Sequence, residues 1–445
     1  MNYTYDGYII RKQSEEIQQK IKNDLTIKVN DYNYDKSISF EIFQREEDIY
    51  KIPKFWGFKF IENLPILKLR DENKINIEFK GEIRDNQKKI LDEIIPSLSR
   101  IGGGILSIPC GEGKTIIAIK LIQHLGLRTL FIVNTSVLMK QTKDRIEQFT
   151  NARVGVIRRN KIDIDNKDIV IGMLHSLALK DYHPSIFNIF DLLIVDEVHC
   201  IATRIFSKVL LKITTPYTIG LTATPKRADK MEKIFYWFLG PMLLLKETPK
   251  NNNIIVNIYY YTDPKMKAIL YHNKLLLTKM ISKLSLLEER NKLICKILKD
   301  ILTEDKERNV LILSDQINHL VNLRDMFDNE RTMISTTLMI GKMKEHEREI
   351  AKTKQVIFGT YKLVSVGFDL DKLDTIILAS PRSNIKQSIG RITRKPNPLK
   401  PPMIIDIIDT VTGFKEQGIK RVKYYKMLDY NINYQTNEIN DLLNF

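Results

Sequence analysis

The sequence predicts an α/β protein with two tandem parallel-sheet lobes and a small N-terminal α/β or β-rich domain. From about residue 80 onward, short and nearly continuous apolar segments alternate with amphipathic helical stretches. This alternation is typical of doubly wound lobes, whose parallel strands are buried on both faces. It stops near Gly240-Pro241 and resumes after the Asn-rich segment 248–253, so we expect two separate series joined by a linker.

The first series has five predicted strands and at least two predicted helices. The strands are Gly104–Ile108, Thr129–Val133, Asp168–Ile171, Leu192–Val195 and Thr218–Leu221, and the helices are Ile116–Leu125 and Val137–Phe149. The most apolar stretch, Ile234–Leu245, is broken by Gly-Pro and is shorter than the roughly 20 residues that a membrane span needs. We therefore interpret it as buried core and expect no membrane partner.

The second series and the two ends complete the predicted organisation. Its strands lie near Val310–Leu313, Gln355–Phe358, Thr375–Leu378 and Met403–Ile408. The N-terminal residues are rich in Tyr and charge, with short alternating runs at Leu25–Val29 and Ser37–Phe43. We divide the chain into an accessory domain (1–75), a first lobe (76–247), a second lobe (248–425) and a tail (426–445). The Asn-rich end, from about Asn431, is expected to be frayed.

Composition restricts the partners and the compartment. The 445 residues carry a formal net charge of +16, which favours a polyanion such as nucleic acid. A coding bias toward Lys, Ile and Asn explains that charge equally well. The cysteines Cys110, Cys200 and Cys295 form no C-x-x-C pair, so we expect neither a zinc ribbon nor a disulfide framework. The N-terminus shows no secretory signal, and a reducing compartment is predicted.

The segment 107–115 reads Ser-Ile-Pro-Cys-Gly-Glu-Gly-Lys-Thr and lies between a predicted strand and a predicted helix. A phosphate-binding loop requires this context. Gly111 and Gly113 allow backbone N–H groups to turn inward around a phosphate, and the helix N-terminus adds positive potential. Lys114 can reach the β- and γ-phosphates, and the hydroxyl of Thr115 can hold Mg²⁺. The segment predicts ATP binding.

The segment 190–199 places Asp196 and Glu197 at the carboxyl end of an apolar strand. Open α/β sheets bind their ligands at that end. Phosphoryl transfer needs a metal clamp and a positioned nucleophile. We assign Asp196 to the Mg²⁺ shell and Glu197 to the attacking water. A strand that ends in solvated acids is the alternative, and the phosphate loop upstream argues against it.

The segment 387–394 reads Gln-Ser-Ile-Gly-Arg-Ile-Thr-Arg. Arg391 and Arg394 are three residues apart and fall on one face of a predicted helix. Two guanidinium groups that project together suit a transferring γ-phosphoryl group, as arginine fingers do. A solvated basic helix is the alternative interpretation of such a cluster.

These three motifs, in this order, resemble those of superfamily 2 helicases over about residues 80–415. The resemblance implies two RecA-like lobes that hold ATP and Mg²⁺ between them, while nucleic acid runs across both. It also implies roles for residues in the family's weaker motifs. Nucleotide contacts are implied for Arg84, Gln87, Gly367, Asp369 and Gln387, coupling of hydrolysis to lobe movement for His199, Thr222 and Thr224, and strand contacts for Thr135, Ser176, Ser314 and Thr360.

Two shorter elements narrow the resemblance. The segment 49–57, Ile-Tyr-Lys-Ile-Pro-Lys-Phe-Trp-Gly, and parts of 359–381 are similar to helicases of large cytoplasmic DNA viruses, closest to the poxvirus transcript-release DNA helicases. The resemblance implies an ATP-dependent DNA helicase of viral transcription termination, made late, located in the cytoplasmic viral factory and packaged in the virion. Its implied partners are single- or double-stranded DNA, with RNA left open, and a viral transcription complex.

Other functions stay open on the motifs alone. The motifs do not distinguish a DNA motor from an RNA helicase, or from a motor that remodels or anneals duplexes in repair or recombination. A restriction-complex motor would need a nuclease pattern, which the sequence does not show. A nucleotide-gated binding module would not need Glu197 and both arginines. Trp56, Trp237 and Tyr259–Tyr261 are predicted to pack in the core or the sheet rather than to stack on bases.

Overall fold

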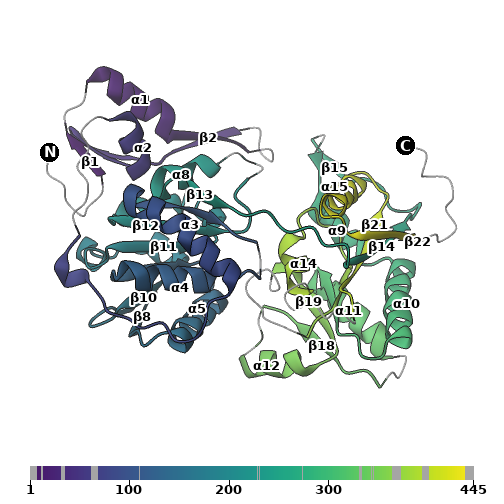
Figure 1. Ribbon diagram of the computed structural model, residues 1–445. Helices are drawn as coiled ribbons and strands as arrows, with labels where there is room; N and C mark the ends of the chain where they lie inside the picture. The colour runs from purple at the N-terminus through teal and green to yellow at the C-terminus, as the bar shows by residue number, and fades with distance from the viewer. Residues whose placement is uncertain are drawn as a thin grey trace. The chain divides into compact units, whose positions relative to one another are not determined.

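The computed structural model describes residues 8–11, 14–31, 36–61, 69–109, 111–227, 229, 231–272, 274–329, 333–341, 343, 345–362, 372–392 and 400–435 (Figure 1). The chain divides between Glu247 and Thr248 into two compact units, here called the first unit and the second unit. Across those described ranges, no helix is long and apolar enough to cross a bilayer.

The first unit is built around an eight-stranded sheet with the order β13-β6-β12-β11-β7-β10-β8-β9. Its strands are β6 (Gly103–Ser107), β7 (Thr129–Val133), β8 (Val154–Arg158), β9 (Lys161–Asp163), β10 (Ile169–Met173), β11 (Leu192–Asp196), β12 (Tyr217–Thr222) and β13 (Met242–Leu245). All neighbours pair in parallel except β8 and β9. The predicted strands of this lobe are therefore present, and the predicted α/β class is confirmed.

Helices cover both faces of this sheet (Figure 1). One set is α3 (Asp85–Ile101), α4 (Lys114–Leu125) and α5 (Ser136–Phe149), and the other is α6 (Leu174–Leu179), α7 (Ser207–Lys212) and α8 (Glu232–Leu239). Successive side chains of a strand point to opposite faces. Ile194 accordingly packs in the core beneath the first set, and Val195 packs in the core beneath the second. Burial on both faces explains the continuous apolar runs in the sequence.

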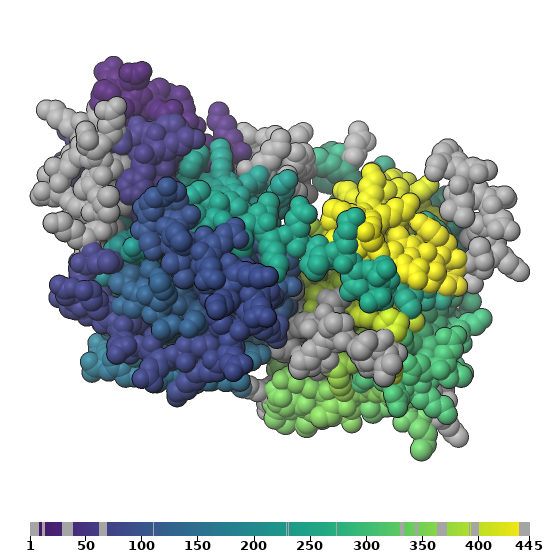
Figure 2. Space-filling model, viewed as in Figure 1, coloured from purple at the N-terminus to yellow at the C-terminus, as the bar shows by residue number. Residues whose placement is uncertain are grey.

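The N-terminal segment, expected to be an accessory domain, packs on the first unit. It contains β1 (Tyr8–Arg11), α1 (Glu15–Leu25), β2 (Thr26–Asp31), β3 (Lys36–Glu41), β4 (Gln44–Glu46), β5 (Ile49–Ile52) and α2 (Lys54–Phe60). Trp56 on α2 is fully buried in the same core as Phe235 on α8. Figure 2 shows this segment, in purple, directly against the blue and teal surface of the unit. Tyr50 and Trp56 of the segment 49–57 therefore contribute to a shared core.

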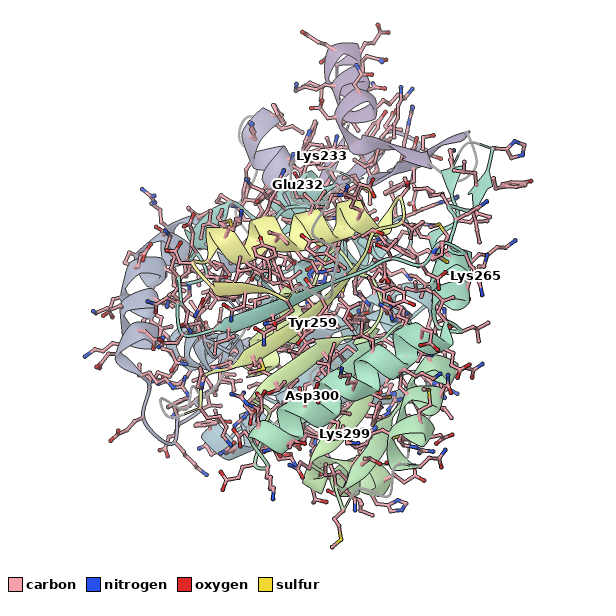
Figure 3. The ribbon with its side chains drawn as sticks, turned by 90° about the vertical axis from the view of Figure 1, so that its right-hand side faces the viewer. Glu232, Lys233, Tyr259, Lys265, Lys299 and Asp300 are labelled. Carbon is pink, nitrogen blue, oxygen red and sulfur yellow. The ribbon has the colours of Figure 1, made fainter. Side chains whose placement is uncertain are left out.

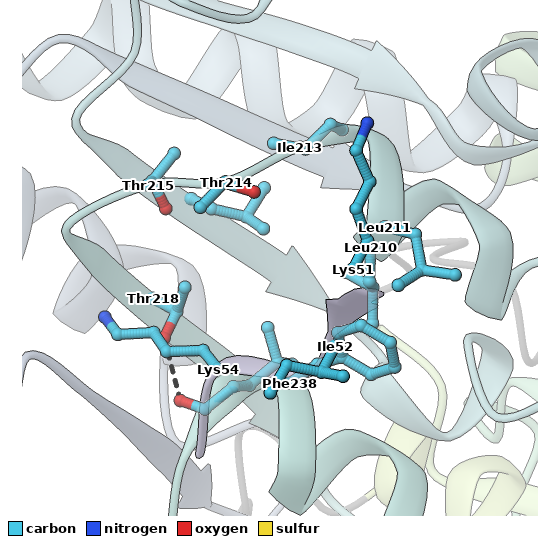
Figure 4. Close-up of a pocket in the computed structure, with 12 residues that line it drawn as sticks. Lys51, Ile52, Lys54, Leu210, Leu211, Ile213, Thr214, Thr215, Thr218 and Phe238 are labelled. Carbon is cyan, nitrogen blue, oxygen red and sulfur yellow. Dashed lines mark hydrogen bonds between the residues drawn. The ribbon is translucent and has the colours of Figure 1, made fainter. Parts of the chain in front are cut away.

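Lys54 attaches α2 to the amino edge of the large sheet. Its buried ammonium nitrogen donates hydrogen bonds to the carbonyls of Gly102, at 3.0 Å, and Pro216, at 2.5 Å, which lie just before β6 and β12. A cavity of about 20 Å³ lies beside it, where the Thr218 hydroxyl donates to the carbonyl of Leu239 (Figure 4). The phosphate loop follows β6 at the opposite, carboxyl edge. The N-terminal segment is thus attached away from the phosphate loop.

The second unit contains a seven-stranded, all-parallel sheet with the order β18-β19-β17-β20-β21-β14-β22. Its strands are β14 (Ile255–Tyr261), β17 (Val310–Ser314), β18 (Thr336–Met339), β19 (Val356–Thr360), β20 (Thr375–Leu378), β21 (Met403–Asp409) and β22 (Asn431–Gln435). The helices around the sheet are α10 (Glu288–Glu304), α11 (Ile317–Asp328), α12 (Glu345–Thr353), α14 (Lys386–Ile392) and α15 (Phe414–Met427). The second βα series expected after residue 253 is present.

The C-terminal segment and Tyr259 were both the subject of expectations about this unit. The end from Asn431 was expected to be frayed, but residues 431–435 form β22 and pair with β14. Ile432 packs against the core and Tyr434 stacks on Tyr260 with ring centroids 6.4 Å apart, which stabilises this edge strand. Residues 436–445 lie outside the described part.

Tyr259 lies on β14 beside α10, so it belongs to the sheet as expected (Figure 3).

Candidate functional site

The phosphate loop in the first unit adopts the backbone geometry that its glycines permit. Gly111 and Gly113 have φ values of +86° and +81°, in the left-handed region that favours glycine. A Cβ at Gly113 would lie 2.2 Å from Nε2 of Gln87, so a side chain there would displace Gln87. Helix α4 begins at Lys114, directly after the loop, so its first N–H groups face the loop.

Lys114 and Thr115 begin this helix at the site. The ammonium nitrogen of Lys114 donates to the carbonyl of Ile108 at 3.3 Å, which keeps the side chain folded back over the loop. Thr115 is half-buried next to it. Both side chains therefore lie where a nucleotide phosphate on the loop would meet them, as the motif predicts.

Gln87 contacts the loop from the segment 84–87, here called the adenine motif because it resembles the helicase element that helps to read adenine. Its side chain is buried, its Nε2 donates to the carbonyl of Glu112 at 3.3 Å, and its Oε1 accepts from the N–H of Arg84 at 3.1 Å. The Arg84 side chain is exposed at the start of α3. Gln87 thus links the start of α3 to the phosphate loop, and its predicted contact with adenine stays a prediction.

A second link to the loop was not foreseen from the sequence. The Glu112 carboxylate accepts a hydrogen bond from Nδ2 of Asn86 at 2.7 Å and forms an ion pair with Lys246 at 3.0 Å. Asn86 lies inside the adenine motif and Glu112 inside the phosphate loop, so both were visible as motif positions. Lys246 follows β13 and carried no sequence signal.

Asp196 and Glu197 lie at the carboxyl end of β11, as expected. Glu197 has φ +53° and ψ +58°, an unusual conformation for a residue with a side chain, and strain of this kind often occurs at functional sites. Its N–H donates to Oδ1 of Asp196 at 3.0 Å. Burial and the neighbouring Glu197 carboxylate raise the pKa of Asp196 to about 7, while the ammonium of Lys114 acts in the opposite direction.

His199 contacts the acidic pair through its imidazole ring. Nδ1 lies 3.3 Å from Oε2 of Glu197. Burial alone would lower the pKa of His199, but hydrogen bonding to Cys200 and Glu197 raises it to about 10. The carbonyl of His199 also accepts a hydrogen bond from Arg227. This last contact connects the acidic motif with the segment 220–227, and Arg227 was not among the predicted site residues.

The coupling residues Thr222 and Thr224 lie at the same edge of the sheet. Asp196 and Leu221 are register partners in adjacent strands, so Thr222 follows directly beside the acidic pair. The Thr222 hydroxyl is buried and accepts the N–H of Thr224 at 3.0 Å. Thr222 holds the turn that leads to Arg227. Their predicted coupling role is compatible with this position.

Two of the four residues expected to contact nucleic acid have inward-facing hydroxyls. Ser176 is buried and accepts the N–H of Arg159 at 3.0 Å. Ser314 is fully buried and lies 3.0 Å from Nδ1 of His319. Both oxygens are bonded inside the fold, and the assignment of the two residues to strand contacts stays a prediction. Thr135 caps α5 by accepting the N–H of Leu138.

The remaining predicted residues belong to the second unit. Thr360 ends β19 and is half-buried. Gln387 is half-buried on α14, and Arg391 occupies the last turn of that helix. The side chain of Arg391, and Gly367, Asp369 and Arg394 entirely, lie outside the described residues. Their assigned roles stay predictions.

The residues of the first unit suit a nucleotide phosphate and a divalent cation. A left-handed loop, a helix N-terminus and Lys114 offer positive potential to a phosphate. Asp196 is buried beside another carboxylate, and a bound cation would relieve the repulsion that raises its pKa. Thr115 and Asp196 would hold Mg²⁺, which would neutralise phosphate charge. Glu197, whose Oε2 lies 3.3 Å from His199, would orient a water molecule.

Known proteins share these features. Residues 80–227 match the family described as Type III restriction enzyme, res subunit. A protein of Acanthamoeba polyphaga mimivirus, named an ATP-dependent RNA helicase, is 35% identical over 96% of this chain and 85% of its own length. A helicase of Invertebrate iridescent virus 6 is 30% identical over 79% of this chain and 82% of its own length. The chain belongs to the viral superfamily 2 helicases.

A solved structure agrees with this membership at the level of the fold. The helicase superposes on the ATP-dependent Type ISP restriction-modification enzyme LlaBIII with a TM-score of 0.58 and 15% identity, over 81% of this chain and 32% of that enzyme. At this identity the likeness shows only the shared fold. The resemblance to superfamily 2 helicases is confirmed, and the helicase is a nucleic-acid-dependent ATPase.

Proposed function

We propose that this helicase uses ATP hydrolysis to move along DNA and that it acts in transcript release during viral transcription. The observation that carries the motor function is the grouping of Lys114, Asp196 and Glu197 at one edge of a parallel sheet, with Thr222 beside them. The resemblance of the segment 49–57 to viral transcript-release helicases supports the proposed role in transcript release. The net charge of +16 favours a polyanionic track.

The first unit supplies most of the proposed chemistry. Lys114 would contact the β- and γ-phosphates, while Thr115 and Asp196 would hold Mg²⁺. Glu197 would orient the attacking water and accept its proton, since its carboxylate is held by the left-handed backbone and by His199. Through its carbonyl, His199 also contacts Arg227, which gives a route from the acidic pair to the segment after β12.

The second unit would complete the site with its arginines. Arg391 and Arg394 would stabilise the charge that develops on the γ-phosphoryl group, as arginine fingers do. Nucleic acid would bind mainly through its phosphates, so binding should tolerate many sequences and weaken with salt. Each hydrolysis cycle would change the relation of the two lobes and move the strand.

An RNA helicase, which would move along RNA, is the second candidate function. The mimivirus relative is named an ATP-dependent RNA helicase, and its identity extends over nearly the whole of this chain. The motifs are shared by DNA and RNA motors. The two tracks therefore require a direct comparison.

One ATPase assay separates these candidates. Hydrolysis is measured without polymer, with single-stranded DNA, with single-stranded RNA and with duplex DNA, using Glu197→Gln as the control for contaminating ATPases. Stimulation by DNA well above that by RNA supports the DNA motor. Stimulation by RNA alone would support the RNA helicase and contradict the DNA motor. If no polymer stimulates hydrolysis, both proposals are wrong. Release of a transcript from a stalled elongation complex then tests the task.

We also propose that the helicase works in the cytoplasmic viral factory, together with a viral transcription complex, and is packaged in the virion as a late product. The proposal rests on the same resemblance to transcript-release helicases. Quantitative immunoblotting of purified particles and fractionation of infected cells test it. Absence of the protein from particles and factories would contradict it.

A further inference from the structure

A small basic subdomain interrupts the second unit between β14 and α10. It spans residues 264–287 and contains a two-stranded hairpin, β15 (Leu270–Tyr271) and β16 (Lys274–Leu275), followed by helix α9 (Leu277–Leu284). None of the helicase motifs falls in this segment. We call residues 264–287 the hairpin module.

The module is anchored to the unit by its own apolar cluster. Met266, Met280 and Leu284 are buried together with Phe414, the first residue of α15. This cluster is separate from the two cores that cover the sheet. This packing therefore fixes the base of the hairpin, and the tip extends from that base.

The tip of the hairpin carries exposed apolar and aromatic side chains. Leu270 and Tyr271 have exposed fractions of 59% and 64%. His272 is also exposed, and its ring meets that of Tyr271 edge-on with centroids 4.3 Å apart. Exposed aromatic rings of this kind leave apolar surface in water unless another molecule covers them.

The module is also strongly basic. It contains five lysines, at 265, 267, 274, 279 and 283, and no Asp or Glu. Four of them, all except Lys274, are exposed, and none of the five forms an ion pair with another residue that the structure describes. Lys265 is seen in Figure 3 on the same side of the unit as the hairpin. The aromatic tip thus stands among uncompensated positive charges.

The module lies at the carboxyl edge of the sheet. It follows Tyr261, the last residue of β14, which runs parallel to every other strand of the sheet. Thr360, at the end of β19, is the residue expected to contact nucleic acid and lies at the same edge. Ligands of open α/β sheets bind at this edge.

We propose that the hairpin module is a binding site for single-stranded nucleic acid, in which an unpaired base stacks on Tyr271 and the lysines contact the flanking phosphates. This inference depends on the proposed function only in assuming that the helicase binds nucleic acid. An exposed aromatic ring surrounded by positive charge matches the way in which single strands are held without sequence preference. A surface with five lysines and no acid repels a second copy of itself, which argues against self-association.

Binding of fluorescent oligothymidine to the full chain tests the aromatic contact. Tyr271→Ala should weaken binding by about 5- to 100-fold, the range for loss of one stacked base, and Tyr271→Phe should bind like wild type because stacking needs only the ring. Tyr434→Ala is the matched control, since Tyr434 is also an exposed tyrosine of the second unit. On an abasic strand of equal length, wild type and Tyr271→Ala should bind equally.

The salt dependence of the same binding tests the lysines. Lys265→Gln together with Lys267→Gln should reduce the slope of log affinity against log salt by about one for each phosphate that the protein no longer neutralises. Lys420→Gln, an exposed lysine on α15, should leave the slope unchanged. An unchanged slope in the double variant overturns the role of these lysines at the phosphates.

The outcomes separate this inference from the proposed function. If wild type is stimulated by a polymer but Tyr271→Ala binds every strand like wild type, the hairpin site is wrong and the motor stands. If no polymer stimulates wild type, the motor proposal itself fails. If Tyr271→Ala changes the oligomeric state in light scattering but not strand affinity, the tip is a protein contact and the inference is overturned.

Discussion

Glu112 in the phosphate loop and Lys246, the residue after β13, form an ion pair, with Oε2 and Nζ 3.0 Å apart. The N–H of Lys246 also donates to the carbonyl of Ser107, the residue that precedes the loop. Lys246 lies two positions before Thr248, where the second unit begins. The phosphate loop is therefore bonded to the last part of the first unit before the chain leaves it.

Glu112→Gln should weaken ATP binding more than it weakens the fold. The pair is partly exposed, so we expect the free energy of unfolding to fall by less than about 1 kcal/mol. The loop would lose its ion pair with Lys246 but keep its contact with Gln87, and the KM for ATP should rise by about 3- to 10-fold. Steady-state ATPase measurements check this. Glu147→Gln, which removes an exposed pair on α5, is the control, and an equal KM in both variants would contradict the positioning role.

Lys114→Ala should abolish ATP turnover. The loop would lose the ammonium that faces the β- and γ-phosphates, and no other described lysine of the loop replaces it. Phosphate release and binding of a fluorescent ATP analogue measure the two losses. Lys120→Ala, on the same helix, should keep both activities. Turnover near the wild-type level in Lys114→Ala would show that the loop is not the nucleotide site.

Glu197→Gln should bind ATP but fail to hydrolyse it. The carboxamide keeps the size of the side chain but cannot accept a proton from the attacking water. The variant should also remain on nucleic acid longer than wild type when ATP is present, which a dissociation assay measures. Turnover at a near wild-type rate with polymer present would place the catalytic water elsewhere.

Arg391→Ala and Arg394→Ala should each reduce turnover by orders of magnitude, roughly 10³-fold or more, as loss of an arginine finger does. The affinity for ATP should change much less, because most of the proposed nucleotide contacts belong to the first unit. Comparing kcat with the Kd of an ATP analogue separates the two effects. A large loss of ATP affinity at unchanged kcat is the result that rules out the finger assignment.

Lys54 should make the stability of the first unit depend on pH. Burial lowers the pKa of its amine from 10.5 to about 7, so between these values the unfolded chain binds a proton that the folded chain does not. The free energy of unfolding should therefore rise with pH across this window, by about 1.4 kcal/mol per pH unit. The neutral amine still has two N–H groups for the carbonyls of Gly102 and Pro216.

Lys54→Met provides the comparison, because it removes the titrating group at similar side-chain volume. Urea unfolding of both proteins at about pH 7 and about pH 10 gives the difference between their pH profiles. Wild type should gain stability relative to the variant as the pH rises. Parallel profiles would show that Lys54 is not neutral in the folded protein.

The sequence alone determined the fold class and the strands of both lobes, and it predicted the residues of the nucleotide site. Strands buried on both faces must be continuously apolar, and the phosphate loop needs Gly at positions with positive φ, so both leave local signals. Lys114, Asp196 and Glu197 could be identified for this reason before their tertiary surroundings were known. The family resemblance assigned Ser176 and Ser314 to strand contacts, but a motif does not show that their hydroxyls are bonded inside the fold.

Only the tertiary structure decided the contacts between distant parts of the chain. Lys246 became a partner of Glu112, and Lys54 became bonded to the carbonyls of Gly102 and Pro216, through contacts that neighbouring residues do not indicate. In the second unit, Arg290 is fully buried and paired with Asp409 at 2.7 Å, although it lies in a charged stretch that resembles a solvated helix. A buried charge is costly unless it has a partner of opposite charge, and here a segment far away in the sequence supplies that partner.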